Sequence, residues 1–379
     1  MKDKKVGLIT YYGNNYGGCL QAYAIQQTIK NLGYNPQILQ VYTPLVGKDF
    51  NKWIAIRRIL KDPLAFLRRR KYIKEYSRNE IIRSQAFDRY RSEFLTFDKS
   101  FTLSVDNLPE AINYDTFVCG SDQIWNPVLY GVHPIWTMKF APIGSKKIAY
   151  APSLGISDIP EQYVADFKNN LKDYTYLSCR EQEGAKCLSR IIGKEVDVVL
   201  DPTLLLTPEQ WHEFACTVNI NKPYIFCYLF GDYHYITEVK KRVKKHFGID
   251  VVCLPYNLRE LKADDLKLYD ITPNQFVWLI ENARYVVTDS FHASVFSIKM
   301  STPFISLKRA SDNDKKNMNS RLYTLLKTVG LEDRMVGENM VECIEDIVNR
   351  KVDFVAANER LAVFMKRDIS KLEKALSYE

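Results

Sequence analysis

The sequence predicts an α/β protein built from two doubly wound, Rossmann-like domains that face each other across a cleft. Short β-branched runs alternate with helical segments in both halves of the chain, which is the pattern of parallel sheets covered by helices. A length of 379 residues also exceeds what one ordinary hydrophobic core accommodates. We expect an N-terminal domain over residues 1–175, a second domain over 176–338, and a final helical region, 339–379, that packs back on the body.

The first half begins with a strand, tight loop, helix and strand at residues 6–12, 13–18, 19–32 and 36–42. Such a unit forms a right-handed parallel crossover. After a helical excursion at 52–97, strands are expected at 116–119, 147–152 and 174–179, with helices at 159–170 and 182–192. The second alternation starts at Tyr224, with strands at 224–230, 249–255, 285–288 and 303–307 and helices at 235–247, 272–282, 294–300, 321–329 and 340–376.

The junction at residues 289–292 is the first candidate for chemistry. It places Asp289, Ser290 and His292 between a buried strand and a helix. Open α/β sheets bind ligands at the carboxyl ends of their strands, where helix amino ends favour anions. We therefore expect a functional site here. A lone histidine in such a place is also often structural.

Two polar loops in the first half are further candidates. In GNNYGG, Gly17 and Gly18 immediately precede a helix, where backbone amides without side chains can meet an anion or a sugar. The motif is neither a dinucleotide-binding nor a Walker loop. In GSDQIWNP, polar side chains follow a strand, and Trp125 offers either a plane for a sugar or a core anchor. Arg180 also follows a strand, as a clamp for carboxylate or phosphate or as a surface partner of Glu181.

Composition excludes several classes of protein. The 46% hydrophobic content suits two packed cores. Neither a signal peptide nor a membrane-spanning run is evident, so we expect a cytoplasmic protein, and eight scattered cysteines predict free thiols rather than a zinc site. Residues 52–74 hold nine Lys or Arg against one Asp, interleaved with apolar side chains. This segment either lies on an anionic membrane at its inner face or forms a solvated helical face. Nucleic-acid binding is not expected.

Four segments together resemble the polysaccharide pyruvyl transferase family. They are NNYGGCLQAYA, GSDQIWNP, TDSFHASVFSI with PFISL downstream, and SRLYTLLKTVGLEDR. The resemblance implies a GT-B-type fold and transfer of pyruvate from phosphoenolpyruvate to a sugar of a bacterial surface polysaccharide, or of its lipid-linked precursor, as a ketal. Ala293 stands where the family often has glycine.

Roles for individual residues follow from this resemblance. A donor with a carboxylate and a phosphate needs fixed cations, and His292 would act as acid and base or bind the phosphate. The expected donor-binding residues are Arg180, Asp289, Ser290, Lys308, Arg309 and Arg321. The expected acceptor-binding residues are Asn15, Gly17, Gly18, Gln123, Trp125 and Asn126. Asp122 would be the base for the attacking hydroxyl, or it would cap the following turn.

No metal or cofactor is expected besides the donor substrate. Two alternatives remain open from the sequence. One is a nucleotide-sugar glycosyltransferase on the same architecture, with Lys308 and Arg309 on a diphosphate. The other is an inactive member of the family that binds sugar.

Overall fold

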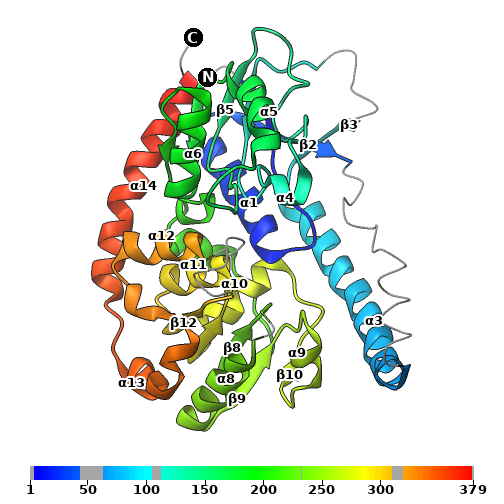
Figure 1. The fold of residues 1–379 in the computed structure, drawn as a ribbon, viewed down its shortest axis with the longest axis vertical. Helices are drawn as coiled ribbons and strands as arrows, with labels where there is room; N and C mark the ends of the chain where they lie inside the picture. The colour runs from blue at the N-terminus through cyan, green and yellow to red at the C-terminus, as the bar shows by residue number, and fades with distance from the viewer. Residues whose placement is uncertain (1–3, 43–62, 105–111, 232, 310–318, 378–379) are drawn as a thin grey trace.

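The computed structural model describes residues 4–42, 63–104, 112–231, 233–309 and 319–377, and it contains two parallel sheets (Figure 1). The first sheet has the strand order β3-β2-β1-β4-β5-β6-β7. Its strands are β1 Lys5–Ile9, β2 Asn35–Val41, β3 Phe97–Leu103, β4 Thr116–Cys119, β5 Lys146–Ala149, β6 Tyr176–Cys179 and β7 Asp197–Val198. Val6, Leu8 and Val118 are fully buried in its centre, as the β-branched and apolar runs predict.

The second sheet has the strand order β10-β9-β8-β11-β12-β13. Its strands are β8 Tyr224–Tyr228, β9 Asp250–Cys253, β10 Leu266–Lys267, β11 Tyr285–Thr288, β12 Phe304–Leu307 and β13 Met335–Val336. β8, β11 and β12 are buried along their whole length. Central strands of a parallel sheet are buried because both faces of the sheet are covered.

Helices connect the strands of both sheets. The α-helices are α1 Tyr16–Asn31, α3 Pro63–Phe94, α4 Pro127–Tyr130, α5 Glu161–Leu171, α6 Gln182–Ile192, α7 Pro208–Phe214, α8 His234–Phe247, α9 Leu258–Lys262, α10 Pro273–Glu281, α11 Phe291–Lys299, α12 Ser320–Val329, α13 Ile344–Asn349 and α14 Phe354–Ser377. The short 3-10 helices are η1 Pro202–Leu204, η2 Glu332–Arg334 and η3 Glu338–Cys343. Within the described ranges no helix is long and apolar enough to cross a bilayer.

Each sheet has one point at which its strand order reverses. In the first sheet β1 pairs with both β2 and β4, and in the second β8 pairs with both β9 and β11. Doubly wound sheets bind ligands in the crevice at such points. Asp122 follows β4 and the junction at 289–292 follows β11. The strand order thus brings the predicted polar residues to the two reversal points.

The boundary expected after residue 175 is wrong in one respect. β6 pairs with β5 and β7 pairs with β6, so residues 176–198 complete the first sheet. The predicted boundary falls between two strands of one domain. Arg180 therefore belongs to the first domain, at the carboxyl end of β6.

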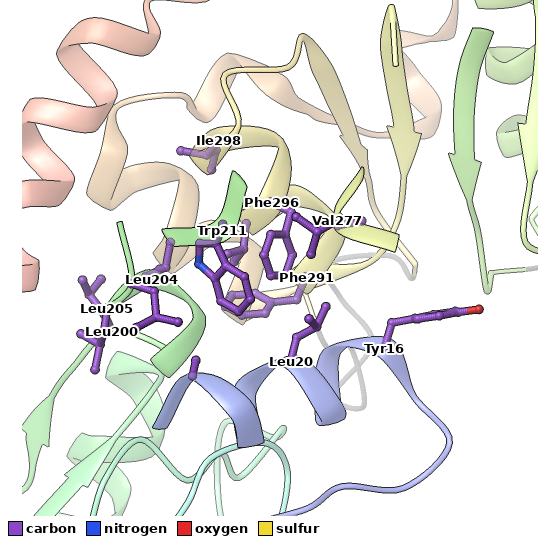
Figure 2. Packing of buried hydrophobic residues seen from close by; sticks show 14 of the residues in the cluster. Tyr16, Leu20, Leu200, Leu204, Leu205, Trp211, Val277, Phe291, Phe296 and Ile298 are labelled. Atoms are coloured by element: carbon purple, nitrogen blue, oxygen red, sulfur yellow. The ribbon is translucent and has the colours of Figure 1, made fainter. Parts of the chain in front are cut away.

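The two domains share one hydrophobic core. Leu20 of α1, Leu204 of η1 and Phe296 of α11 belong to a single buried cluster. Trp211 packs edge-on against Phe296, with ring centres 4.8 Å apart, as Figure 2 illustrates. Because α1 of the first domain packs directly on α10 and α11 of the second, the position of one sheet relative to the other is set by side-chain packing.

The last helix connects the domains a second time. α14 runs along one side of the molecule from the second domain to the first (Figure 1). It packs on α11 and α12, and Lys146 Nζ of β5 donates a hydrogen bond to Leu376 O at 3.2 Å. This agrees with the expected return of the C-terminal helix to the body.

The basic segment lies only partly within the described chain. Residues 63–74 belong to α3, which extends away from the sheets (Figure 1). Residues 52–62 lie outside the described residues. Membrane contact through this segment stays a prediction.

Candidate active site between the two domains

A buried carboxylate, Asp201, joins the two domains. Asp201 Oδ2 accepts a hydrogen bond from Arg180 Nη1 of the first domain at 2.5 Å. The same oxygen lies 3.7 Å from Nε2 of His292, in the second domain. Asp201 Oδ1 accepts hydrogen bonds from the backbone N–H and the hydroxyl of Thr203 at 3.0 and 2.6 Å. One carboxylate therefore fixes the distance between the predicted guanidinium and the predicted imidazole.

Asp201 stays ionised in this position. Burial would raise the pKa of its carboxyl, but the polar contact with His292 and the positive charge of Arg180 outweigh burial and hold the pKa well below its usual range. Arg180 is only 4% exposed, and its guanidinium also stacks on the ring of Phe291, 4.6 Å from the ring centre. The pair is therefore a rigid, charged element of the interface.

His292 packs directly on the first turn of α1. A Cβ atom placed on Gly17 would lie 1.9 Å from His292 Nδ1, and one placed on Gly18 would lie 2.6 Å from a ring carbon of Tyr11. These glycines were expected to meet a ligand. They are buried and instead allow side chains of the protein to approach the helix. The groups that approach α1 closely are His292 and Tyr11, and ligand binding by these glycines stays a prediction.

We predict that Gly17→Ala displaces His292. The added methyl group cannot fit beside the imidazole, so both the stability of the protein and the activity that depends on His292 should fall. In a His292→Ala background the methyl group has space, and the loss of stability should largely disappear. Urea unfolding of the two single variants and the double variant measures this coupling. Equal costs in both backgrounds would contradict the packing described.

Two polar residues of the junction after β11, Asp289 and Ser290, make hydrogen bonds that hold the local structure. Ser290 caps α11, because its hydroxyl accepts a hydrogen bond from Ala293 N at 3.5 Å. Asp289 accepts hydrogen bonds from the backbone of Phe230 and Gly231, and its Oδ1 lies 3.4 Å from Arg309 Nη2. Asp289 thus holds the loop after β8 and orients Arg309. Direct donor binding by this buried, fully occupied carboxylate is not supported.

Two adjoining cavities open between the domains. The small cavity measures about 210 Å³ and is lined by Tyr11, Asn15, Asp122, Gln123, Leu129, Tyr130, Phe230, Ser290, Phe291, His292, Arg309 and Arg321. The large cavity measures about 660 Å³ and is lined by residues from α6, η1, α12 and α14 together with Arg180 and Asp201. Phe291 and Arg321 line both, so the cavities share a wall.

The small cavity has an excess of cationic side chains. Two guanidinium groups, Arg309 and Arg321, line it with one carboxylate, Asp122, and His292 lines it as well. Burial and the nearby charge of Arg180 lower the pKa of Arg321 to about 10. A bound anion would relieve this repulsion. The electrostatics of the cavity therefore favour a small anionic ligand.

Asp122 combines both roles that the sequence left open. Its Oδ1 accepts a hydrogen bond from Gln123 N at 2.8 Å, and its backbone has a φ of 64°. Asp tolerates this left-handed conformation through such local bonds. The same oxygen lies 3.9 Å from Arg180 Nη2, and the residue lines the small cavity. Asp122 is thus a turn residue that remains within reach of a ligand.

Three other predicted site residues do not reach the cavity. Trp125 is 1% exposed and donates a hydrogen bond from Nε1 to Trp136 O at 3.0 Å, so its expected role as a sugar platform is wrong and the core interpretation holds. Asn126 caps α4 and bonds to Gln123. Lys308 Nζ lies 5.2 Å from the centre of the Tyr323 ring and lines neither cavity.

Three residues of the site were missed in the sequence. Asp201 comes three residues after β7, a strand of only two residues, and it caps η1. Tyr11 and Tyr130 line the small cavity, and burial raises the pKa of Tyr130 to about 12. The signal that could have found Asp201 is an aspartate before a proline at the end of a short apolar run, residues 198–200.

A possible cation site elsewhere is already filled by a side chain. Cys253, Glu260 and Asp265 place ligand atoms close together, but Lys240 Nζ lies 2.7 Å from Glu260 and 2.5 Å from Asp265. The ammonium group supplies the positive charge there. All eight cysteines are free thiols, as predicted.

The comparison with protein families decides the classification. The family model described as polysaccharide pyruvyl transferase matches residues 15–311. The chain belongs to this family. The match includes the Asp122 loop, Arg180, Asp201 and the His292 junction, and it ends before α12 and α14. No curated protein sequence matches the chain.

Solved structures with a similar fold are distant in sequence. The Arabidopsis thaliana protein UGT89C1 complexed with UDP-L-rhamnose has a TM-score of 0.50 at 10% identity, over 98% of each chain. An S. aureus MnaA–UDP structure has a TM-score of 0.50 at 10% identity, over 96% of this chain and 90% of that one. The UDP-GlcNAc 2-epimerase of Methanocaldococcus jannaschii has a TM-score of 0.47 at 12% identity, over 95% and 98%. The two structures with a TM-score of 0.50 are similar in fold alone, and they confirm the GT-B-like architecture of this pyruvyl transferase family member.

Proposed function

We propose that the protein transfers pyruvate from phosphoenolpyruvate to a sugar of a surface polysaccharide, or of its lipid-linked precursor, as a ketal. The observation that carries the proposal is the small cavity, in which Arg309, Arg321 and His292 gather at the interface of two Rossmann-like domains. A donor with a carboxylate and a phosphate suits the two guanidinium groups of Arg309 and Arg321. Membership of the pyruvyl transferase family supports the same assignment.

The proposed reaction conserves all atoms of donor and acceptor. A proton adds to the methylene carbon of the enol, one sugar hydroxyl attacks the adjacent carbon, phosphate leaves with the C–O bond pair, and a second hydroxyl closes the ketal. His292 would deliver the proton to the methylene carbon or accept one from a hydroxyl, because an imidazole can both donate and accept a proton. Asp122 would accept the proton of the attacking hydroxyl. Arg309 and Arg321 would hold the phosphate and carboxylate.

Asp201 would act behind the reacting groups. It neutralises Arg180, and the same Oδ2 atom lies 3.7 Å from Nε2 of His292. Fixed charges of this kind need no reorganisation when the reaction occurs.

Calorimetry with phosphoenolpyruvate tests the donor assignment. We predict that Arg321→Gln weakens phosphoenolpyruvate binding by roughly tenfold or more, the usual consequence of losing a charged hydrogen bond. Lys327→Gln is the matched control, since it removes one charge from the same helix and Lys327 lines only the large cavity.

The control distinguishes the two cavities. Equal weakening by both variants would place the donor outside the small cavity or indicate a nonspecific effect of charge. Titration with UDP-sugars in the same experiment tests the glycosyltransferase alternative. Binding of UDP-sugars without binding of phosphoenolpyruvate would replace the present proposal, and binding of neither would favour an inactive member.

A further inference from the structure

Three side chains on α14 hold the segment at residues 197–200, which directly precedes Asp201. Asp368 Oδ2 accepts a hydrogen bond from Leu200 N at 2.8 Å. Arg367 Nη2 donates to Val198 O at 3.0 Å. Lys371 Nζ lies 2.6 Å from Asp197 Oδ1. Side chains of the last helix therefore contact both the backbone of this segment and the side chain of Asp197.

Asp368 has the most constrained position of the three. Its exposure is 0%, and its Oδ1 is paired with Arg367 Nε at 2.7 Å. β7 ends at Val198, so Leu200 N has left the sheet ladder when it reaches Asp368. A buried N–H group needs an acceptor, and here a side chain supplies it. Loss of that acceptor would leave an unsatisfied donor one residue before Asp201.

α14 is anchored in the second domain as well. Leu361 and Leu372 belong to the core cluster that both domains share, and α14 packs on α11, the helix that carries His292. The helix thus contacts the segment that leads to Asp201 on one side and the helix of His292 on the other. α14 therefore links the segment before Asp201 to α11, and the separation of these two elements sets the distance between Asp201 and His292.

We infer that Asp368 is a positioning residue for the active site, acting through Leu200 on Asp201 and through Asp201 on Arg180 and His292. The inference rests on the proposed function for its link to the donor. The family match ends at residue 311, so α14 contributes to the site from outside the matched region. Asp368 does not line either cavity and touches no reacting atom.

The test compares Asp368→Ala, Asp368→Asn and Leu361→Ala in the full-length protein. Asparagine keeps an oxygen that can accept from Leu200 N, whereas alanine does not. Leu361→Ala removes a buried apolar side chain of the same helix and destabilises it, while the three polar contacts with residues 197–200 are kept. Two quantities are measured: phosphoenolpyruvate affinity by calorimetry, and the NMR signal of the Arg180 Nε–H group without ligand.

Asp368→Ala should weaken phosphoenolpyruvate binding about tenfold and shift the Arg180 signal, as expected when a buried hydrogen bond that fixes a site is lost. Asp368→Asn should restore the affinity to within about threefold of the native protein, and Leu361→Ala should leave both quantities unchanged. A native Arg180 signal in Asp368→Ala, or an equal change in Leu361→Ala, would overturn the inference. If the native protein fails to bind phosphoenolpyruvate, the proposed function fails, and the Arg180 signal still decides the role of Asp368.

Discussion

Asp201→Asn is expected to lower the free energy of unfolding by about 3–5 kcal/mol, the range for removing one partner of a buried ion pair. Arg180 would remain buried and charged beside a neutral amide, because it is only 4% exposed. The same change should abolish most activity, since the partner of both Arg180 and His292 loses its charge. This combined loss is the largest effect that we predict.

The contribution of Asp201 also depends on pH. Its pKa in the folded protein is lowered, because the polar contact with His292 and the charge of Arg180 outweigh the effect of burial. Because the pKa is lower in the folded protein than in the unfolded chain, the ionised carboxyl stabilises the fold at pH values above the unfolded pKa of about 3.9. That stabilisation is lost as the pH falls below about 4 toward the folded pKa. The native protein should lose stability in this range, and Asp201→Asn should lack this part of the loss.

Urea unfolding at pH 7 and at acidic pH measures both effects. Asp158→Asn is the matched control, because Asp158 pairs with Arg190 at 2.6 Å while both side chains are about two-thirds exposed. The control should leave stability nearly unchanged. If Asp201→Asn has the same free energy of unfolding as the native protein at pH 7, the buried charge of Arg180 does not need this carboxylate and the prediction is wrong.

Lys299→Met is expected to stabilise the protein, by on the order of 4 kcal/mol at pH 7. Lys299 lies in α11 and is 2% exposed, and its Nζ contacts the sulfur of Met365 at 3.4 Å. A thioether is a weak acceptor for an ammonium group. Burial therefore lowers the pKa of Lys299 to about 7, and folding at neutral pH works against its protonation.

The direction of the pH effect follows from proton uptake. Between about pH 7 and the unfolded value of about 10.4, the unfolded chain holds a proton that the folded protein has lost. Stability contributed by this site therefore rises with pH over that window. Lys299→Met should remove the rise. The quantity to compare is the difference in free energy of unfolding between native protein and Lys299→Met at each pH. Buried tyrosines with raised pKa values lower the stability of both proteins at high pH, and the difference removes their effect.

Thermal unfolding of native protein and Lys299→Met from pH 7 to 10 tests this expectation. Lys366→Met on α14 is the matched control, because Lys366 is exposed and its replacement should change stability little. A stability difference between native protein and Lys299→Met that stays constant with pH would contradict the buried, neutral amine.

The sequence was sufficient to predict the architecture wherever strands were long and buried. The strand at 116–119 and the helix at 182–192 were predicted with their observed bounds. β7, β10 and β13 were missed because each has two residues, too few for any periodicity to appear. β3 was missed because its pattern, FDKSFTL, is polar at the sheet edge. The domain boundary failed for the same reason, since β7 showed no signal.

The candidate site was partly predictable because strand ends can be read from the sequence. Asp122, Arg180 and His292 each follow a strand. The structure places Asp122 and His292 on the small cavity, and Arg180 on the adjoining large cavity, 3.9 Å from Asp122. The roles of Gly17 and Trp125 depend on which side chains pack against them, and local sequence does not contain that information. Asp201 gains its importance only from the meeting of two domains, and Asp368 from a helix 168 residues away from Leu200.

The most direct test of the account is mass spectrometry of candidate repeat-unit oligosaccharides after incubation with phosphoenolpyruvate. The native protein should produce an oligosaccharide that carries a pyruvate ketal, with release of one phosphate per product. Folded His292→Ala should lose at least roughly a hundredfold in rate, as expected for a group that transfers protons. Transfer by His292→Ala at the native rate would contradict a site in which the imidazole of one domain and the guanidinium of the other act together.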